Sequence, residues 1–299
     1  MKIFILILSL INFGCNLITG KSEDNKNNSL YALGVLAASN SSSSCTTNAC
    51  KTTCLGSTIT TTSIDSDMPS WISNNFACVK AYKTTESGVD YYVFETEDVP
   101  PHKSPYWGSA SANYESMPAG NTQLISSFLS QSYKFKIPVT PTVASGGSAT
   151  APGVAAGVAT NGVVLFFGQA SPGNSLSSEL STFDSAQGHP DGGSKRYHYH
   201  ALPKYITDYE TKLIGIMSDG YPIYGSKEED GTTPSTTTTT GSNNQYPVLN
   251  ADTYGHSHAT ADFPSGTFHY HITNWDNTVN IPSMPVFTYG TITIGNITY

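Results

Sequence analysis

The sequence predicts a mostly β protein, built as a single sandwich or barrel-like domain with long loops and little helix. Only 12% of the 299 residues are charged, which is about half the usual share in soluble domains. Gly, Ser, Thr, Asn and Tyr take their place, and these residues favour strands and loops over long helices. Short β-rich runs also alternate with turn residues along most of the chain, as in sandwiches and barrels.

Residues 1–15 predict an export signal that ends in a lipidation site. MKIFILILSL has one lysine and an apolar run of about ten residues, shorter than the ~20 that a membrane-crossing helix requires. Cys15 follows Gly14 as the acylated cysteine does in a bacterial lipobox, although Asn12 and Phe13 fit only a relaxed form of that motif. We expect a cell-envelope lipoprotein of the outer membrane or surface, which touches the membrane only through its lipid anchor. Simple secretion, periplasmic or extracellular, is the alternative.

Residues 16–64 predict a flexible tether rich in Ser, Thr and Asn. Four cysteines remain once Cys15 is set aside, and an even number in an exported protein predicts disulfides. The sequence leaves all three pairings open. A zinc cluster is less well supported, because CTTNACKTTC contains no CxxC pair. The four residues are Cys45, Cys50, Cys54 and Cys78.

Residues 65–299 are expected to form the β domain. GTTPSTTTTTG, residues 231–241, is of low complexity and predicts an exposed insertion. A short helical period appears only at 121–131. Runs rich in β-branched and aromatic residues predict strands at 89–96, 132–139, 161–168, 196–202, 212–218, 267–275 and 291–299.

Charge and motifs exclude several classes of function. The net charge is −8 and Arg196 is the only arginine, so no basic surface is available to neutralise phosphates, and we expect no nucleic acid partner. The sequence has no GxGxxG or phosphate loop, and we expect neither a nucleotide nor a flavin. It has no GxSxG motif for a serine nucleophile, and cysteines held in disulfides are not nucleophiles.

The histidines form two similar blocks, GHPDGGSKRYHYH at 188–200 and GHSHATADFPSGTFHYH at 255–271. Each block runs from Gly-His through a polar turn to an aromatic residue and His-Tyr-His. Because side chains alternate along a strand, the two imidazoles of each HxH pair share one face and the aromatic rings take the other. We expect the rings to pack in the core. The block histidines are His189, His198, His200, His256, His258, His269 and His271.

A pair of HxH strands is a common plan for a metal site. We expect the two strands to converge on one site that binds copper or zinc, since imidazole suits both ions. Asp219, between the blocks, is the first choice for an oxygen ligand or for an acceptor from an imidazole N–H. Asp184 and Asp252 each precede a Gly-His and could orient its histidine; a plain turn is the alternative role for each of these carboxylates.

The ordered series GH, YHYHALP, LIGIMSDGYPIYG, a second GH and FHYHIT resembles the YHYH domain family. The resemblance extends upstream through WISNNFACVKAY, FKIPVTPTV and GVATNGVVLFF, and so covers about residues 70–275. It implies an exported bacterial protein, with little implied about biochemistry. Relatives carry one cysteine before the first YHYH and another after its Leu-Pro, where this chain has residues such as Ala186 and Tyr205. The resemblance therefore implies that this loop is held without that disulfide.

Three classes of function remain. Metal binding ranks first; it includes a metalloenzyme with an open coordination position, and the sequence leaves open whether the protein is an enzyme. A surface module that binds a small ligand, a glycan or a host molecule without metal ranks second. A purely structural role for the histidines ranks third.

Overall fold

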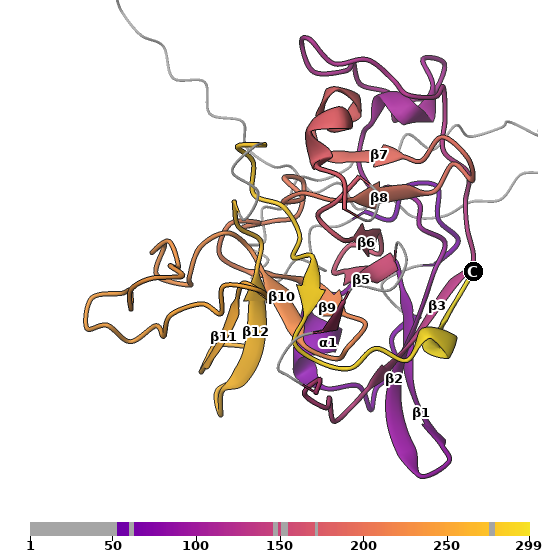
Figure 1. Ribbon diagram of the computed structural model, residues 1–299. Coiled ribbons are helices and arrows are strands. Elements are labelled where there is room, and N and C mark those ends of the chain that lie inside the picture. The colour runs from indigo at the N-terminus through magenta and orange to yellow at the C-terminus, as the bar shows by residue number, and fades with distance from the viewer. Residues whose placement is uncertain (1–52, 60–62, 146–148, 151–154, 171–172, 275–278) are drawn as a thin grey trace, which may run out of the picture. The chain divides into compact units, whose positions relative to one another are not determined.

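The computed structural model describes residues 53–59, 63–145, 149–150, 155–170, 173–274 and 279–299. The regular structure in these residues is mostly β, as expected (Figure 1). Within them, no helix is long and apolar enough to cross a membrane. The helical elements are α1 (Ser70–Asn75) and the 3-10 turns η2 (Pro105–Trp107), η3 (Leu176–Ser178), η4 (Leu180–Thr182) and η5 (Ile294–Asn296).

The smaller sheet is antiparallel and has the order β1-β2-β3-β14. Its third strand alternates strictly between buried and half-buried residues, so one face is apolar and packs inward. A separate two-stranded ribbon pairs β4 (Ala149–Thr150) with β13 (Phe287–Thr288). The strands of the smaller sheet are β1 (Lys80–Glu86), β2 (Val89–Thr96), β3 (Tyr133–Pro138) and β14 (Ile297–Thr298).

The larger sheet has eight strands in the order β11-β12-β10-β9-β5-β6-β8-β7. It begins and ends on unpaired edges, so in the described residues it is an open sheet and not a barrel. Its strands are β5 (Ala155–Ala159), β6 (Val164–Phe166), β7 (Gly188–Pro190), β8 (Tyr197–Tyr199), β9 (Leu213–Met217), β10 (Pro222–Tyr224), β11 (Gly255–His258) and β12 (Thr267–His271).

This sheet consists of two copies of one four-stranded unit, β5 to β8 and β9 to β12. In each copy the first two strands, β5 and β6 or β9 and β10, pair antiparallel. The second strand then pairs parallel with the fourth strand of the copy, β8 or β12. The fourth strand pairs antiparallel with the third, β7 or β11, which forms the edge of the sheet. The copies meet where β5 pairs antiparallel with β9. The topology therefore has an approximate two-fold axis between β5 and β9, and each histidine block forms one outer edge of the sheet.

The centre of the sheet requires glycine in both copies. A Cβ on Gly157 would collide with the backbone of Ile216, and a Cβ on Gly215 would collide with the backbone of Val158. A tight turn then follows in each copy, at Asn161-Gly162 and at Asp219-Gly220, and both turn glycines have positive φ. The side chains of Asn161 and Asp219 accept hydrogen bonds from backbone N–H groups two residues later.

The two sheets pack against each other in a sandwich-like arrangement. Phe94 and Phe135 of the smaller sheet share one apolar cluster with Val158 and Ile216 of the larger sheet, and α1 contributes Ile72 to it. A second cluster covers the other face of the larger sheet and includes the tyrosines of both histidine blocks, Tyr197, Tyr199 and Tyr270. The expectation that these rings pack in the core is confirmed.

The one expected helix is wrong, and several expected strands are shorter than expected. Residues 121–131 form no helix, because their backbone bonds to distant loops: Leu129 N–H donates to Lys195 and Gln131 N–H donates to Glu97. Phe128 packs against the core, but Leu124 and Leu129 are exposed, so the apolar residues of this segment form no continuous buried face. The strand expected at 291–299 is limited to β14, with the 3-10 turn η5 immediately before it.

Cys54 and Cys78 form a disulfide, one of the pairs that the sequence left open. Cys45, Cys50 and the expected lipidation site at Cys15 lie outside the described residues. The insertion at 231–241 lies between β10 and β11 and is mostly exposed.

Candidate metal centres

The first histidine cluster lies on the hairpin of β7 and β8. His189 pairs directly with His198 across the two strands, and His200 follows two residues later on the same face as His198. All three histidines are buried, and one ring nitrogen of each lies within 4.8 Å of the others. The Nε2 atoms of His198 and His200 are 2.9 Å apart.

Glu179, between η3 and η4, borders this first cluster. Its Oε2 lies 3.4 Å from His200 Nε2 and 3.6 Å from His189 Nε2. Within the described residues, neither Glu179 Oε2 nor His189 Nε2 has a hydrogen-bond partner, although both atoms are buried. Unpaired buried polar atoms are costly, so their convergence indicates a site built for something the chain itself does not supply.

The second cluster lies on the hairpin of β11 and β12 and contains four histidines and a glutamate. His256 pairs directly with His269, the same register as in the first hairpin. The five donor atoms all lie within 4.8 Å of one another, and they belong to His256, His258, His269, His271 and Glu228.

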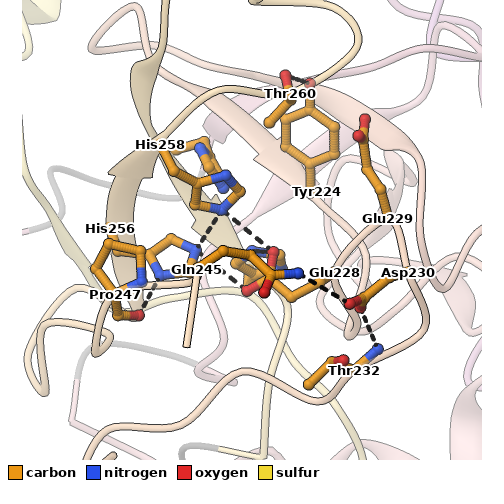
Figure 2. A network of polar contacts seen from close by, with 12 residues as sticks. Tyr224, Glu228, Glu229, Asp230, Thr232, Gln245, Pro247, His256, His258 and Thr260 are labelled. Carbon is orange, nitrogen blue, oxygen red and sulfur yellow. Dashed lines mark hydrogen bonds and ion pairs between the residues drawn. The ribbon is translucent and has the colours of Figure 1, made fainter. Parts of the chain in front are cut away.

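Glu228 lies at the centre of the second cluster and is almost fully buried (Figure 2). Its carboxylate oxygens lie 3.3 Å from His256 Nε2, 3.2 Å from His258 Nε2 and 3.5 Å from His271 Nε2. The His256 and His258 Nε2 atoms are 3.1 Å apart. A carboxylate surrounded by imidazole nitrogens is a donor set that suits a transition metal ion.

Every block histidine is fixed through its Nδ1 atom. Six of the seven face backbone carbonyls, which only accept hydrogen bonds, so Nδ1 must carry the hydrogen. The six pairs are His198 to Arg196 (2.9 Å), His200 to Phe167 (2.5 Å), His256 to Pro247 (2.7 Å), His258 to Ala259 (2.8 Å), His269 to Thr267 (3.2 Å) and His271 to Gly225 (2.9 Å).

His189 follows the same rule through a hydroxyl. Its Nδ1 lies 2.7 Å from Thr182 Oγ1, and that hydroxyl donates its own hydrogen to the Glu179 carbonyl at 2.6 Å. Thr182 must therefore accept from His189. In every neutral block imidazole, Nε2 then carries the lone pair and points into the cluster. Histidines that bind metal ions are commonly oriented in this way, by a hydrogen bond from the other ring nitrogen.

Burial keeps the imidazoles of the first cluster uncharged near neutral pH. Burial lowers the pKa of His189 to about 3 and of His200 to about 4, and it lowers the pKa of His198 well below its ordinary value. Burial also raises the pKa of Glu179 to about 7. The cluster thus presents three unprotonated nitrogens that face one another, a repulsive arrangement which a cation would relieve.

The second cluster holds an ionised carboxylate instead. Burial raises the pKa of Glu228, but its contacts with His258 and His271 outweigh burial and leave the pKa well below its ordinary value. Burial lowers the pKa of His256 to about 4, whereas for His258 the contact with Glu228 outweighs burial and raises the pKa. A cation bound among these groups would take the place of a proton shared between Glu228 and His258.

The expectation that both blocks line one site is wrong. Four strands, β10, β9, β5 and β6, lie between β12 and β8 in the sheet. Neighbouring strands are about 4.8 Å apart, so the two hairpins are separated by roughly 20 to 25 Å. The two blocks resemble each other in sequence because they occupy equivalent positions in two copies of one unit. These positions are at opposite edges of the sheet.

The predicted role of Asp219 is also wrong, since this residue belongs to neither cluster. It is fully buried and accepts hydrogen bonds from the Tyr270 hydroxyl, Gly290 N–H and Tyr221 N–H. It orients the tyrosine between His269 and His271, on the opposite face of the strand.

The other two carboxylates orient no histidine through a contact in the described residues. Asp184 accepts from the Tyr197 hydroxyl at 2.7 Å and from Ala186 and Gly188 N–H, and so closes its own loop. This contact helps to hold the loop around Ala186 without a disulfide in the described residues. Asp252 is exposed and belongs to neither cluster.

Glu179 and Glu228 were not predicted from the sequence. Each lies in the long connection between the second and third strands of its copy, but Glu179 is far from Phe166 in the chain and Glu228 is close to Tyr224. No constant spacing links them to the histidines. The one available signal is the acidic run in KEEDG, residues 227–231, which precedes the insertion.

His102, the eighth histidine, belongs to neither cluster. Its Nε2 lies 2.8 Å from the Tyr199 hydroxyl, on the face of β8 opposite His198 and His200. It lines a cavity of about 410 Å³ together with Asn161 and Tyr205.

The fold and the two clusters define a mostly β protein with two buried groups of residues that could hold metal ions. Residues 134–253 match the family described as YHYH protein. The match includes the first cluster and Glu228 and ends before the second histidine block at 255–271. No curated protein and no solved structure matches the chain.

Proposed function

We propose that this protein binds two transition metal ions, copper or zinc, with one ion in each histidine cluster. The observation that supports the proposal most strongly is the orientation of the seven imidazoles. All are held by Nδ1–H, and their Nε2 atoms approach as close as 2.9 Å and 3.1 Å. In the first cluster, where burial lowers the pKa of all three imidazoles, two neutral nitrogens that face each other with their lone pairs repel, and a shared metal ion turns that repulsion into coordination.

The choice of ion rests on donor chemistry. Imidazole and carboxylate donors suit both Cu(II) and Zn(II), and copper binds such sites more strongly in the Irving–Williams order. Three or four imidazoles with a nearby carboxylate also match the donor numbers of zinc sites. Calcium and magnesium prefer sites made of oxygen donors, so these ions fit poorly.

We further propose that the protein acts in the cell envelope. The N-terminal run MKIFILILSL and Cys15 support export and lipidation, and the Cys54–Cys78 disulfide supports an oxidising compartment. Incorporation of labelled palmitate that is lost in Cys15→Ser would support the lipid anchor, whereas equal labelling of both forms would contradict it.

Metal content tests the binding proposal. Protein prepared without an affinity His-tag is loaded with Cu(II) or Zn(II) and dialysed. Its metal content is then measured by inductively coupled plasma mass spectrometry. The intact protein is expected to retain two ions per chain. His189→Asn with His198→Asn removes two of three imidazoles and is expected to retain only the ion of the second cluster.

The complementary variant carries Asn at His256, His258 and His271 and is expected to retain only the ion of the first cluster. Asn is close to His in size and polar, so folding is checked by circular dichroism for each variant. His102→Asn is the matched control, since His102 lies outside both clusters, and it is expected to retain both ions. No retained metal in the intact protein contradicts the proposal.

A further inference from the structure

The two clusters occupy equivalent positions but differ in their number of donors. Gly188 and Gly255 open the two hairpins in the same register, and the following histidines, His189 and His256, each pair with the first histidine of an HxH strand. The second cluster adds a fourth imidazole, His258, two residues after His256. The residue that occupies this position in the first hairpin shows why the clusters differ.

That residue is Asp191, two positions after His189, and its carboxylate is held in the turn between β7 and β8. It accepts from Gly193 N–H at 2.9 Å, from Ser194 N–H at 2.6 Å and from Arg196 Nε at 2.7 Å. Because the turn and the only arginine of the chain bind this carboxylate, the first cluster receives no fourth donor from the edge strand.

The two glutamates also differ, because Glu228 contacts more imidazoles than Glu179 and is more deeply buried. The Glu228 side chain is 2% exposed and contacts three imidazoles, so it fills the second cluster from inside. The Glu179 side chain is 27% exposed and reaches only two imidazoles of the first cluster. The first cluster is therefore bordered by the partly exposed carboxyl group of Glu179.

We propose that the first cluster holds its metal ion through three imidazoles and takes a water or a small inorganic anion as a further ligand, whereas the second cluster is closed by its own side chains. This inference rests on the proposed metal binding. Three protein ligands and one exchangeable position distinguish reactive metal sites from structural ones, and a fourth or fifth protein donor closes the site. Glu179 lies where it can hydrogen-bond to the exchangeable ligand.

Cobalt(II) and azide test the inference, because Co(II) replaces zinc with a visible spectrum that reports its ligands. The variant with Asn at His256, His258 and His271 isolates the first cluster, and His189→Asn with His198→Asn isolates the second. Azide is expected to change the Co(II) spectrum of the first cluster in a saturable titration. The second cluster is expected to bind azide at least about tenfold more weakly, if at all.

Removal of the two additional donors provides a gain-of-function control. In the variant that isolates the second cluster, Glu228→Gln with His258→Asn leaves three imidazoles and is expected to create an azide response. Equal azide responses of the two isolated clusters would overturn the inference and leave metal binding intact. An azide response of the first cluster that appears only after Glu179→Gln would also overturn it, because Glu179 would then be the fourth ligand. Failure of the intact protein to take up Co(II) would instead contradict the proposed function.

Discussion

At the scale of single residues, Asp219 is the clearest case of a functional residue type in a structural position. Burial raises its pKa to about 6, although the Tyr270 hydroxyl and two backbone N–H groups lower it in part. Asn161 takes the same place in the other copy of the unit and donates to Tyr199 at 3.1 Å. Both side chains fix the tyrosine of an HYH strand, and only one of them can ionise.

The raised pKa of Asp219 predicts a pH dependence of stability. A carboxyl whose pKa is higher in the folded than in the unfolded protein stabilises the fold while it is protonated, and this contribution is lost as the pH rises from about 4 to about 6. The loss amounts to roughly 3 kcal/mol for a shift of this size. Asp219→Asn is expected to remove that part of the pH dependence in urea unfolding between pH 4 and pH 7.

The same substitution at the exposed Asp67 is the matched control and is expected to leave the pH dependence unchanged. Because Asn resembles the protonated carboxyl, the free energies of unfolding of wild type and Asp219→Asn should be most alike at pH 4 and differ most at pH 7. A difference that is constant across the pH range would show that burial of Asp219 does not govern this dependence.

At the scale of elements, each histidine hairpin follows from the alternation of a short strand. The sequence allowed the faces to be predicted correctly: His198 and His200 lie on one side of β8, and Tyr197 and Tyr199 pack in the core on the other. Strand β2 coincides with the predicted 89–96. The prediction of a helix at 121–131 was wrong, because a short apolar period is not sufficient where Phe128 packs against the core but Leu124 and Leu129 are exposed.

The crossing of β5 and β9 predicts a strong effect of single methyl groups. Gly157→Ala and Gly215→Ala each place a Cβ against the backbone of the opposite strand. Each is expected to lower the free energy of unfolding by about 2 to 3 kcal/mol or more, as overpacking of a rigid core does. Gly192→Ala is the control, since its nearest atom is a side-chain carbon 3.8 Å away, and it is expected to change stability by less than about 0.5 kcal/mol. Equal effects of all three would contradict the close approach.

At the scale of the whole molecule, the organising feature is the duplication of a four-stranded unit. The repeated histidine blocks indicate half of it. The other half is the relation between GVATNGVVLFF and GIMSDGYPIY, which form the first two strands of each copy. Because a sequence pattern carries no information on strand order, two equivalent blocks suggested one shared site. The order instead brings β5 and β9 to the centre and the histidine hairpins to the edges.

The distance between two bound copper ions tests the central claim, two separate metal sites at opposite edges of one sheet, most directly. Protein loaded with two Cu(II) ions is measured by pulsed electron paramagnetic resonance, which detects the dipolar coupling between them. Five steps between neighbouring strands predict a separation of about 20 to 25 Å, and the coupling is expected to vanish in both cluster variants. Two ions that couple strongly at a few ångströms, or a single ion bound by both histidine blocks, would contradict the account.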